Sequence, residues 1–298
     1  MGIPFADRLP WPREAAQPDP APAADLTLAP SNIALDVHGN PARARLHVYS
    51  DGNHHMALAE TMAAFLAARP EVEDIFYLTT PPRLSIEALS SGRVRLGNLE
   101  ISTAPHVLIG PEEILGSLHD QGVIASNTPF MRSAGNVPLF RKGNPKGIEG
   151  VSSLFRDDVR LALSNPITES ASFTIYAADL VAAAPTDAPN GGWQAWLESD
   201  AVVKSRVIHH REIPELLALD AADVSLIYRH LGLRYARVFP DVFEIGDIVD
   251  PANTTRYHVG LIGDGGPFGR EFAEHLQSSE VAAIYRSHGL AALDDPLV

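Results

Sequence analysis

From residue 45 onward, short apolar runs alternate with longer stretches in which apolar residues recur at helical spacing. The run RLHVYS at 45–50 predicts a strand, and 55–69 predicts a helix that Pro70 ends. Further strands are predicted at 74–78, 106–110, 136–141, 159–164, 205–210, 224–228 and 257–262, and further helices at 84–90, 111–119, 170–184, 193–199, 213–219, 267–276 and 280–288. Strands that alternate with helices predict an α/β fold.

The alternation is interrupted by a turn at 142–147 and then begins again. We therefore expect two α/β blocks, at about 45–135 and 138–236, followed by a C-terminal piece with one strand and helices. The start of the chain is rich in Pro and Ala, so residues 1–44 are predicted to be an N-terminal arm that is partly extended.

Composition limits the chemistry that the chain can perform. It contains no cysteine, which excludes thiol catalysis, cysteine metal sites and disulfides. Its formal net charge of −14 argues against nucleic acid and anionic membranes as partners, because both favour basic surfaces. A small anion remains compatible with this charge, since local donors such as N–H groups at a helix start can hold it.

The beginning of the sequence carries no recognisable targeting segment. Residues 1–30 lack a basic region followed by an apolar run, and no stretch reaches the roughly 20 apolar residues of a membrane helix. We predict no membrane insertion, and the protein is either cytoplasmic or exported with a signal that this sequence does not include.

Four loops lie where open α/β sheets bind ligands, beyond the carboxyl ends of strands and at helix N-termini. SDGNHH at 50–55 offers a hydroxyl, a glycine and the N–H groups of a helix start. LTTP at 78–81 offers two hydroxyls, and NPITESAS at 165–172 offers a cluster of them. YRH at 228–230 adds an arginine, which can donate charge-assisted hydrogen bonds to an anion.

Each loop also has a purely structural interpretation. Asp51 or Asn53 can cap the helix at 55–69, and Thr168 or Ser170 can cap the helix at 170–184 with Glu169 in its first turn. The second loop can be a solvated turn, and the fourth a surface arginine beside a core tyrosine.

Histidines fall near predicted strand ends, which raises the alternative of a metal or metal-complex site. They are His54, His55, His106, His209, His210 and His230. No metal-binding spacing such as H-E-x-x-H connects them, and we predict no metal. A second alternative is an enzyme that uses His54, His55 or His230 as general base. No nucleophile elbow, phosphate loop or dinucleotide motif is present, and we predict no catalysis and no cofactor.

The order of segments resembles that of the type II periplasmic solute-binding proteins, particularly the branch that binds molybdate, tungstate and similar oxyanions. The pieces that carry the resemblance are RLHVYSDGNHHMALAETMAAF at 45–65, GNVPLFRKGNPKGIEGVSSLF at 135–155, VRLALSNPITESASFTIYAADLV at 159–181, AADVSLIYRHLGL at 221–233, and HVGLIGDGGPFGREFAEHLQSSEVAAIYRSHGL at 258–290.

The resemblance implies a two-lobed architecture in which two open α/β domains are joined by two crossover strands, with the ligand in the interlobe cleft. Lobe 1 would comprise residues 45–135 and 240–298, and lobe 2 residues 136–239. Hinge bending near 136–139 and 234–240 would close the lobes.

The resemblance also implies which residues contact the ligand. These are Ser50, Gly52, Asn53, His54, Thr79, Thr80, Thr168, Ser170, Ala171, Ser172, Tyr228 and Arg229. The chain departs from the family at Pro105-His106, where Ala-Asp is usual, and at Ser172-Phe173-Thr174, where Gly-x-Tyr is usual. Another oxyanion, a phosphorylated compound or a small carboxylate is therefore an alternative to molybdate and tungstate.

The resulting prediction is a monomeric solute-binding protein that takes up or senses a small anion. Its expected partners are the anion and the permease of an ABC transporter. The resemblance implies a periplasmic location, and a cytoplasmic location is the alternative.

Overall fold

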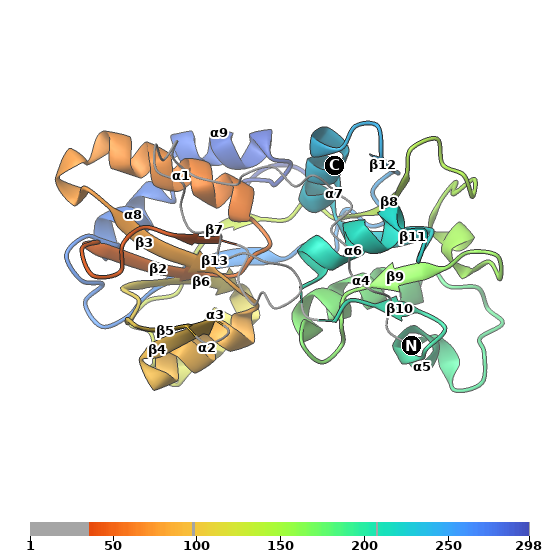
Figure 1. The fold of residues 1–298 in the computed structure, drawn as a ribbon, viewed down its shortest axis with the longest axis horizontal. Coiled ribbons are helices and arrows are strands. Elements are labelled where there is room, and N and C mark those ends of the chain that lie inside the picture. The colour runs from red at the N-terminus through yellow and green to blue at the C-terminus, as the bar shows by residue number, and fades with distance from the viewer. Residues whose placement is uncertain (1–35, 97–98, 207, 298) are drawn as a thin grey trace. The chain divides into compact units, whose positions relative to one another are not determined.

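The computed structural model describes residues 36–96, 99–206 and 208–297, which divide into two compact units (Figure 1). The first unit contains residues 36–132 and 255–295, and the second contains residues 133–254. The chain passes between the units at 132–133 and at 254–255. Most of the arm predicted for residues 1–44 lies outside the described residues.

A six-stranded sheet forms the centre of the first unit, in the order β1-β3-β2-β6-β13-β7. Its strands are β1 (Asp36–His38), β2 (Leu46–Ser50), β3 (Ile75–Thr79), β6 (Val107–Pro111), β7 (Thr128–Arg132) and β13 (Arg256–Leu261). Strand β2 is parallel to both β3 and β6, whereas β13 is antiparallel to β6 and β7. Residues from the end of the chain therefore complete the sheet that the beginning of the chain starts.

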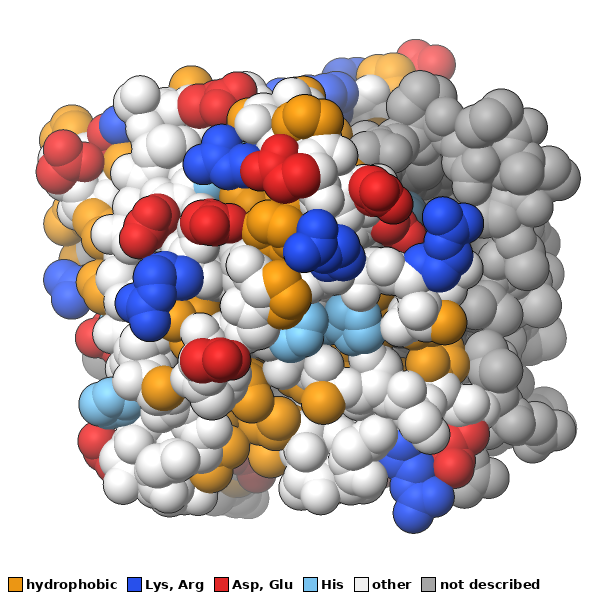
Figure 2. All heavy atoms as spheres, turned by 90° about the vertical axis from the view of Figure 1, so that its left-hand side faces the viewer, with side chains coloured by type: hydrophobic (Ala, Val, Ile, Leu, Met, Phe, Trp, Pro, Cys, Tyr) orange, Lys and Arg blue, Asp and Glu red, His pale blue; other side chains and the backbone are white. Residues whose placement is uncertain are grey.

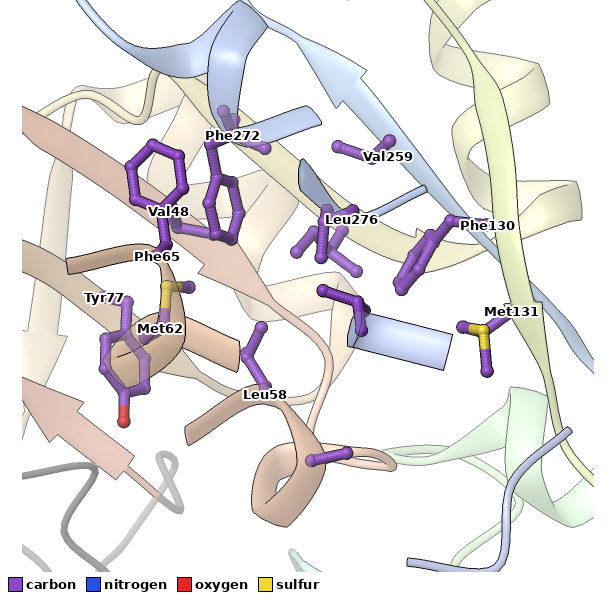
Figure 3. Packing of buried hydrophobic residues seen from close by; sticks show 14 of the residues in the cluster. Val48, Leu58, Met62, Phe65, Tyr77, Phe130, Met131, Val259, Phe272 and Leu276 are labelled. Atoms are coloured by element: carbon purple, nitrogen blue, oxygen red, sulfur yellow. The ribbon is translucent and has the colours of Figure 1, made fainter. Parts of the chain in front are cut away.

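Helices cover both faces of this sheet, which is why its parallel strands are continuous apolar runs. They are α1 (His55–Ala68), α2 (Pro82–Ser91), α3 (Glu112–Asp120), α8 (Gly269–His275) and α9 (Ser279–Ser287). Successive strand residues point to opposite faces. Val48 packs in the core beneath α1, α8 and α9, and Tyr49 packs in the core beneath α2 and α3. Figure 3 shows the first of these cores, with Val48, Phe65 and Phe272 in it.

The remaining elements of the first unit are short. Strands β4 (Arg93–Leu96) and β5 (Leu99–Ser102) form an antiparallel hairpin, and one 3-10 turn spans Pro70–Val72. Helix α2 ends at Gly92, whose left-handed backbone (φ 69°) is the conformation that closes many helices.

The second unit is built on a five-stranded sheet in the order β10-β9-β11-β8-β12. Its strands are β8 (Asn136–Arg141), β9 (Leu161–Leu163), β10 (Val203–Lys204), β11 (Val224–Tyr228) and β12 (Phe243–Ile245). Its helices are α4 (Ser170–Ala182), α5 (Gly192–Glu198), α6 (His209–Ala218) and α7 (Arg229–Val238), with a 3-10 turn at Val151–Phe155. Strand β9 is parallel to β10 and β11, and β8 is antiparallel to β11 and β12.

The strand predicted at 205–210 is wrong, because His209 and His210 open helix α6. The side chain of Glu169 accepts a hydrogen bond from the backbone N–H of His209 and so fixes the helix start. Pro214 lies inside α6 and cannot donate to the carbonyl one turn earlier. That carbonyl belongs to His210, and it accepts instead from the Tyr235 hydroxyl at 2.7 Å. The helix therefore continues through a residue that normally breaks it.

Residues 234–240, near which one hinge was predicted, include the end of helix α7, and the hinge stays a prediction. Tyr235 is 1% exposed, and its hydrogen bond to α6 anchors this segment within the second unit. The polar sequence of α7 concealed a helix whose buried side, with Leu231 and Tyr235 one turn apart, faces the core. Strands β7 and β12 and the hairpin β4–β5 were not predicted either.

Replacing Leu276 by Ala should lower the free energy of unfolding by about 2–5 kcal/mol, since this side chain is 1% exposed in the core of Figure 3 and its loss leaves a cavity. The matched control is Leu293→Ala, at a side chain that is 41% exposed, and it should cost less than about 0.5 kcal/mol. Urea denaturation of both variants checks this, and equal losses would contradict the assigned core.

Candidate functional site

Three of the predicted ligand residues meet in the first unit at the carboxyl ends of two neighbouring strands. Ser50 ends β2 and pairs in register with Thr79, which ends β3. The Thr80 N–H donates to the Ser50 carbonyl at 3.0 Å. All three side chains are buried, although they carry hydroxyl groups. The parallel pairing of β2 with β3 is what brings these loops, 29 residues apart in sequence between Ser50 and Thr79, to one edge of the sheet.

The loop after β2 turns tightly into helix α1. The Asp51 carboxylate accepts from the Asn53 N–H at 3.0 Å, and the ring Nδ1 of His55 lies 2.9 Å from the Gly52 carbonyl. The N-cap residue is His54, and it makes no side-chain capping hydrogen bond. The predicted caps, Asp51 and Asn53, are therefore not the residues that begin α1. The first N–H groups of a helix have no partners inside the helix. In α1 these groups begin at His55, shortly after Ser50 ends β2.

His54 lies at the centre of a buried polar group that sequence reasoning did not foresee. Its ring Nδ1 is 2.8 Å from the Tyr285 hydroxyl, a contact between α1 and α9. Its Nε2 is 3.3 Å from Asp51 Oδ1 and 3.4 Å from Ser50 Oγ. The ring also packs against Tyr257, with centroids 4.8 Å apart. Aromatic neighbours thus surround the histidine that the resemblance places at the ligand.

Burial governs the charge of this group. Desolvation, with a smaller contribution from the neighbouring His55, lowers the pKa of His54 to about 3. Desolvation raises the pKa of Asp51 to about 7, against the lowering effect of the Asn53 N–H and of His55. Burial also raises the pKa of the Tyr285 hydroxyl well above its ordinary value. His54 is therefore neutral at physiological pH, and Tyr285 keeps its proton.

A second set of predicted residues lies in the second unit, where β9 leads into α4. The Asn165 side chain accepts from the N–H groups of Ile167 and Thr168 at 2.8 and 3.1 Å, and so closes the loop. Helix α4 begins at Ser170 after Glu169 as N-cap, so neither Thr168 nor Ser170 has the predicted capping position. Ser172 is buried, Ala171 half-buried and Ser170 exposed.

Glu169 has a structural task that explains why a carboxylate is buried here. It accepts from the Ser205 hydroxyl at 3.1 Å and from the His209 N–H at 2.8 Å, and it lies 2.7 Å from His209 Nδ1. The other ring nitrogen of His209 is 3.1 Å from the Tyr176 hydroxyl, which accepts from the Tyr228 N–H at 3.4 Å. A continuous polar chain thus connects α4 and α6 to the end of β11.

Tyr228 and Arg229 stand where β11 passes into α7. Tyr228 is 1% exposed and stacks on the His230 ring at 5.3 Å. The Arg229 N–H donates to the Gly135 carbonyl at 3.0 Å, and its side chain is half-buried. The second unit therefore contains the predicted residues of the two later loops, and the first unit contains those of the two earlier loops.

Buried oxygen atoms without a hydrogen-bond partner mark further residues in these loops. Among the described residues, they include Oδ2 of Asp51 and the hydroxyls of Ser85, Ser164 and Thr168. Thr168 was predicted as a ligand contact, whereas the other three were missed. Ser164 follows β9 directly and Ser85 lies in the first turn of α2, so their place at a strand end and a helix start was the available signal. Buried polar atoms are normally satisfied, so these oxygen atoms are exceptions among the described residues.

Charges of both signs are found on the face of the protein that Figure 2 shows. Figure 2 shows one end of the molecule with acidic and basic side chains interspersed rather than a basic field. In the described part of the chain, no three His, Asp or Glu side chains are grouped to hold a metal ion. Within that same part, no helix combines the length and apolar character needed to cross a membrane.

These features define a two-unit α/β protein with ligand-type loops at strand ends, and comparison with known proteins gives its family. The model of the bacterial extracellular solute-binding protein family matches residues 46–291, so the chain belongs to that family. No curated protein sequence matches the chain.

Solved structures share the fold at low sequence identity. The substrate-binding protein of an ABC transporter from Agrobacterium tumefaciens has a TM-score of 0.65 at 16% identity, covering 89% of this chain and 85% of that one. The sulfate-binding protein SubI from Mycobacterium tuberculosis H37Rv has a TM-score of 0.63 at 15% identity, covering 84% and 87%. The periplasmic molybdate-binding protein of Azotobacter vinelandii has a TM-score of 0.58 at 14% identity, covering 83% and 98%.

The family and the fold predicted from the sequence are thus confirmed. The chain is a member of the bacterial extracellular solute-binding protein family, and it has the type II periplasmic-binding-protein fold of these neighbours. The family is extracellular, and its members and these neighbours are binding proteins.

Asp51→Asn should stabilise the protein at high pH. The folded-state pKa of about 7 lies above the ordinary 3.8, so the folded chain loses stability as the pH rises from about 4 through 7, when the buried carboxyl must ionise. The amide does not ionise and has no such cost. The variant should therefore have a free energy of unfolding up to about 4 kcal/mol higher than the wild type at pH ~8, and almost the same value at pH ~4. Urea denaturation at both pH values checks this, with Asp264→Asn, at an exposed carboxylate, as control. A gain that is larger at low pH would contradict the assignment.

Glu169→Ala should destabilise the protein by about 3 kcal/mol, because it leaves the buried His209 N–H and ring without their acceptor. The matched control is Glu149→Ala at an exposed carboxylate, for which the expected change is within about 0.5 kcal/mol. Guanidinium unfolding of the two variants measures the difference. Similar values for both would show that the Glu169 contacts contribute little.

Proposed function

We propose that the protein binds a small anion for ABC-type uptake or sensing. The observation that carries the proposal is the set of buried hydroxyls at strand ends and helix starts, some of which have no partner among the described residues. The set comprises Ser50, Thr79 and Thr80 in the first unit and Ser164 and Thr168 in the second. The hydroxyls without a partner among the described residues are those of Ser164 and Thr168. Hydroxyl and N–H donors in such positions can replace the water that an anion loses on binding.

The anion-binding residues in this proposal are those that the sequence predicted. In the first unit they are Ser50, Gly52, Asn53, His54, Thr79 and Thr80, which share one edge of the sheet or the loop beside it. In the second unit they are Thr168, Ser170, Ala171, Ser172, Tyr228 and Arg229, which follow β9 or end β11. The resemblance implies that both sets serve one ligand, and this stays a prediction.

Several of the proposed first-unit ligand residues are uncharged groups that can donate hydrogen bonds to an anion. Ser50 and Thr79 carry no charge, and His54 has a pKa far below neutrality because it is buried. An oxyanion would therefore meet dipoles rather than a full positive charge, as it does at a helix N-terminus. The sulfate-binding and molybdate-binding neighbours support this class of ligand. Molybdate, tungstate, another oxyanion, a phosphorylated compound and a small carboxylate are the candidates.

The proposed partners follow from the family. A solute-binding protein of the ABC-transporter type delivers its ligand to a permease, so we propose a permease as partner and the periplasm as location. If the ligand binds one conformation of the protein more tightly than another, ligand binding shifts the protein toward that conformation and so couples binding to delivery.

The anion proposal is tested first by thermal unfolding of the purified protein with molybdate, tungstate, sulfate, phosphate and small carboxylates. At least one should raise the melting temperature, because a ligand that binds only the folded state stabilises it. Failure of every anion to do so would remove the proposal.

Calorimetry then tests the residues. Ser50→Ala and Thr168→Ala should each weaken binding of the active anion by about 10-fold to 100-fold, the effect of one lost hydrogen bond to a charged group. Ser90→Ala, at an exposed hydroxyl in α2, is the matched control and should bind like the wild type. Wild-type affinity in both test variants would place the ligand elsewhere.

A further inference from the structure

We infer that the rings of His47 and His106 form an acid-sensitive latch at the start of strand β2, which holds β2 against β6 while the rings are neutral and releases it when they take up protons. The latch lies at the opposite end of β2 from Ser50, and it does not rest on the proposed anion-binding function. It involves two sequence features that the candidate site leaves unexplained, the departure at Pro105-His106 and the glycine-rich run at 263–266.

The His106 ring takes the place of a backbone acceptor at the start of β2. The His106 N–H donates to the His47 carbonyl at 2.9 Å, and the His47 N–H donates in return to Nδ1 of the His106 ring at 3.2 Å. Regular pairing of the two strands begins one residue later, at Val48 and Val107. Because a backbone N–H can only donate, the ring nitrogen that accepts from it carries no proton. The neutral His106 ring therefore has its hydrogen on Nε2.

The proton of the His47 ring is fixed in the same way. Its Nε2 is 3.1 Å from the Ala44 carbonyl, and its Nδ1 is 2.6 Å from the Thr103 hydroxyl. A carbonyl can only accept, so Nε2 carries the hydrogen and Nδ1 accepts from the hydroxyl. The centroids of the His47 and His106 rings are 5.1 Å apart. At this separation a positive charge on one ring raises the energy of a positive charge on the other.

The packing around His106 keeps its ring in place. A Cβ at position 266 would lie 2.6 Å from Cδ2 of the ring, so Gly266 is what allows the loop to approach this closely. Gly266 also has a left-handed backbone (φ 60°), and its N–H donates to the Asp264 side chain at 3.0 Å. If His106 takes up a proton, the new N–H at Nδ1 therefore faces the N–H of His47, and the hydrogen bond between them is lost.

The surroundings of the two rings favour their neutral forms. Burial is the largest cause that lowers the pKa of His106, the His47 ring lowers it further, and the exposed Asp264 carboxylate acts in the opposite direction. Burial also lowers the pKa of His47, against two backbone hydrogen bonds and the charge of Asp74. The Arg45 guanidinium, near the start of β2, donates to a backbone carbonyl at 3.2 Å.

The direction of the pH effect follows from these pKa values. Because both folded-state pKa values lie below the ordinary 6.5, the latch contributes fully above pH 6.5, and its contribution is lost as the pH falls from 6.5 through the lowered values. An opened latch has ordinary histidines that take up protons first, so acid favours the open form. Strand β2 pairs with both β3 and β6, so opening its start loosens the centre of the first sheet.

Hydrogen exchange of the full, ligand-free chain, followed by mass spectrometry, tests the latch. After correction for the intrinsic pH dependence of exchange, amide protection in 46–49 and 106–109 should fall about 10-fold in the wild type between pH ~7.5 and pH ~5. In His106→Asn the side-chain oxygen can accept from the His47 N–H without titrating, so the fall should be no more than about 3-fold. His119→Asn, at an exposed histidine of α3, is the matched control and should behave like the wild type.

Equal losses of protection in the wild type and in His106→Asn would overturn the inference, and so would a wild type that loses none. His106→Ala is the second variant if the Asn variant does not fold. It removes the ring acceptor, so the same amides should be poorly protected at both pH values, and wild-type protection near neutral pH would refute the latch. Anion binding enters none of these outcomes, so they leave the proposed function untouched.

Discussion

The parallel pairing of β2 with β3 and β6 is the constraint on which the candidate site of the first unit depends. Parallel strands need crossover helices, and these must begin where the strands end, so the loops that carry Ser50 and Thr79 meet at one sheet edge. Val48 and Tyr49 are adjacent in β2 and pack into the cores on opposite faces of the sheet. This packing keeps the strand register, because a slip by one residue would exchange the two faces. The position of the polar loop is thus set by apolar packing beneath it.

Much of this arrangement could be predicted from the sequence because it is local. The strands at Asn136–Arg141 and Val224–Tyr228 have the predicted ends, and helix α1 begins at the predicted residue, His55. Each is a strong run of one period bounded by turn residues. The loops of the candidate site were located by the same reasoning, because the rule that ligands bind beyond strand ends needs only the order of strands and helices.

The parts that could not be predicted depend on contacts between residues far apart in sequence. Pro214 is tolerated inside helix α6 because the Tyr235 hydroxyl donates to the carbonyl that the proline cannot reach with an N–H group. The charge of Asp51 depends on its burial beside Tyr285, which lies more than 230 residues away. A local sequence pattern does not show which oxygen of a carboxylate has hydrogen-bond donors. The polar group around His54 could therefore be identified only in the structure.

The return of β13 to the first unit also governs the order in which the protein can be completed on the ribosome. Residues 133–254 form one continuous unit, and all of them are synthesised before β13 at Arg256–Leu261 takes its place between β6 and β7. Until then the first sheet has two unmatched strand edges, and Tyr285 has not yet reached His54. The second unit can therefore fold while the first is still unfinished, and the nascent first sheet is the stage at which the protein is most exposed to aggregation.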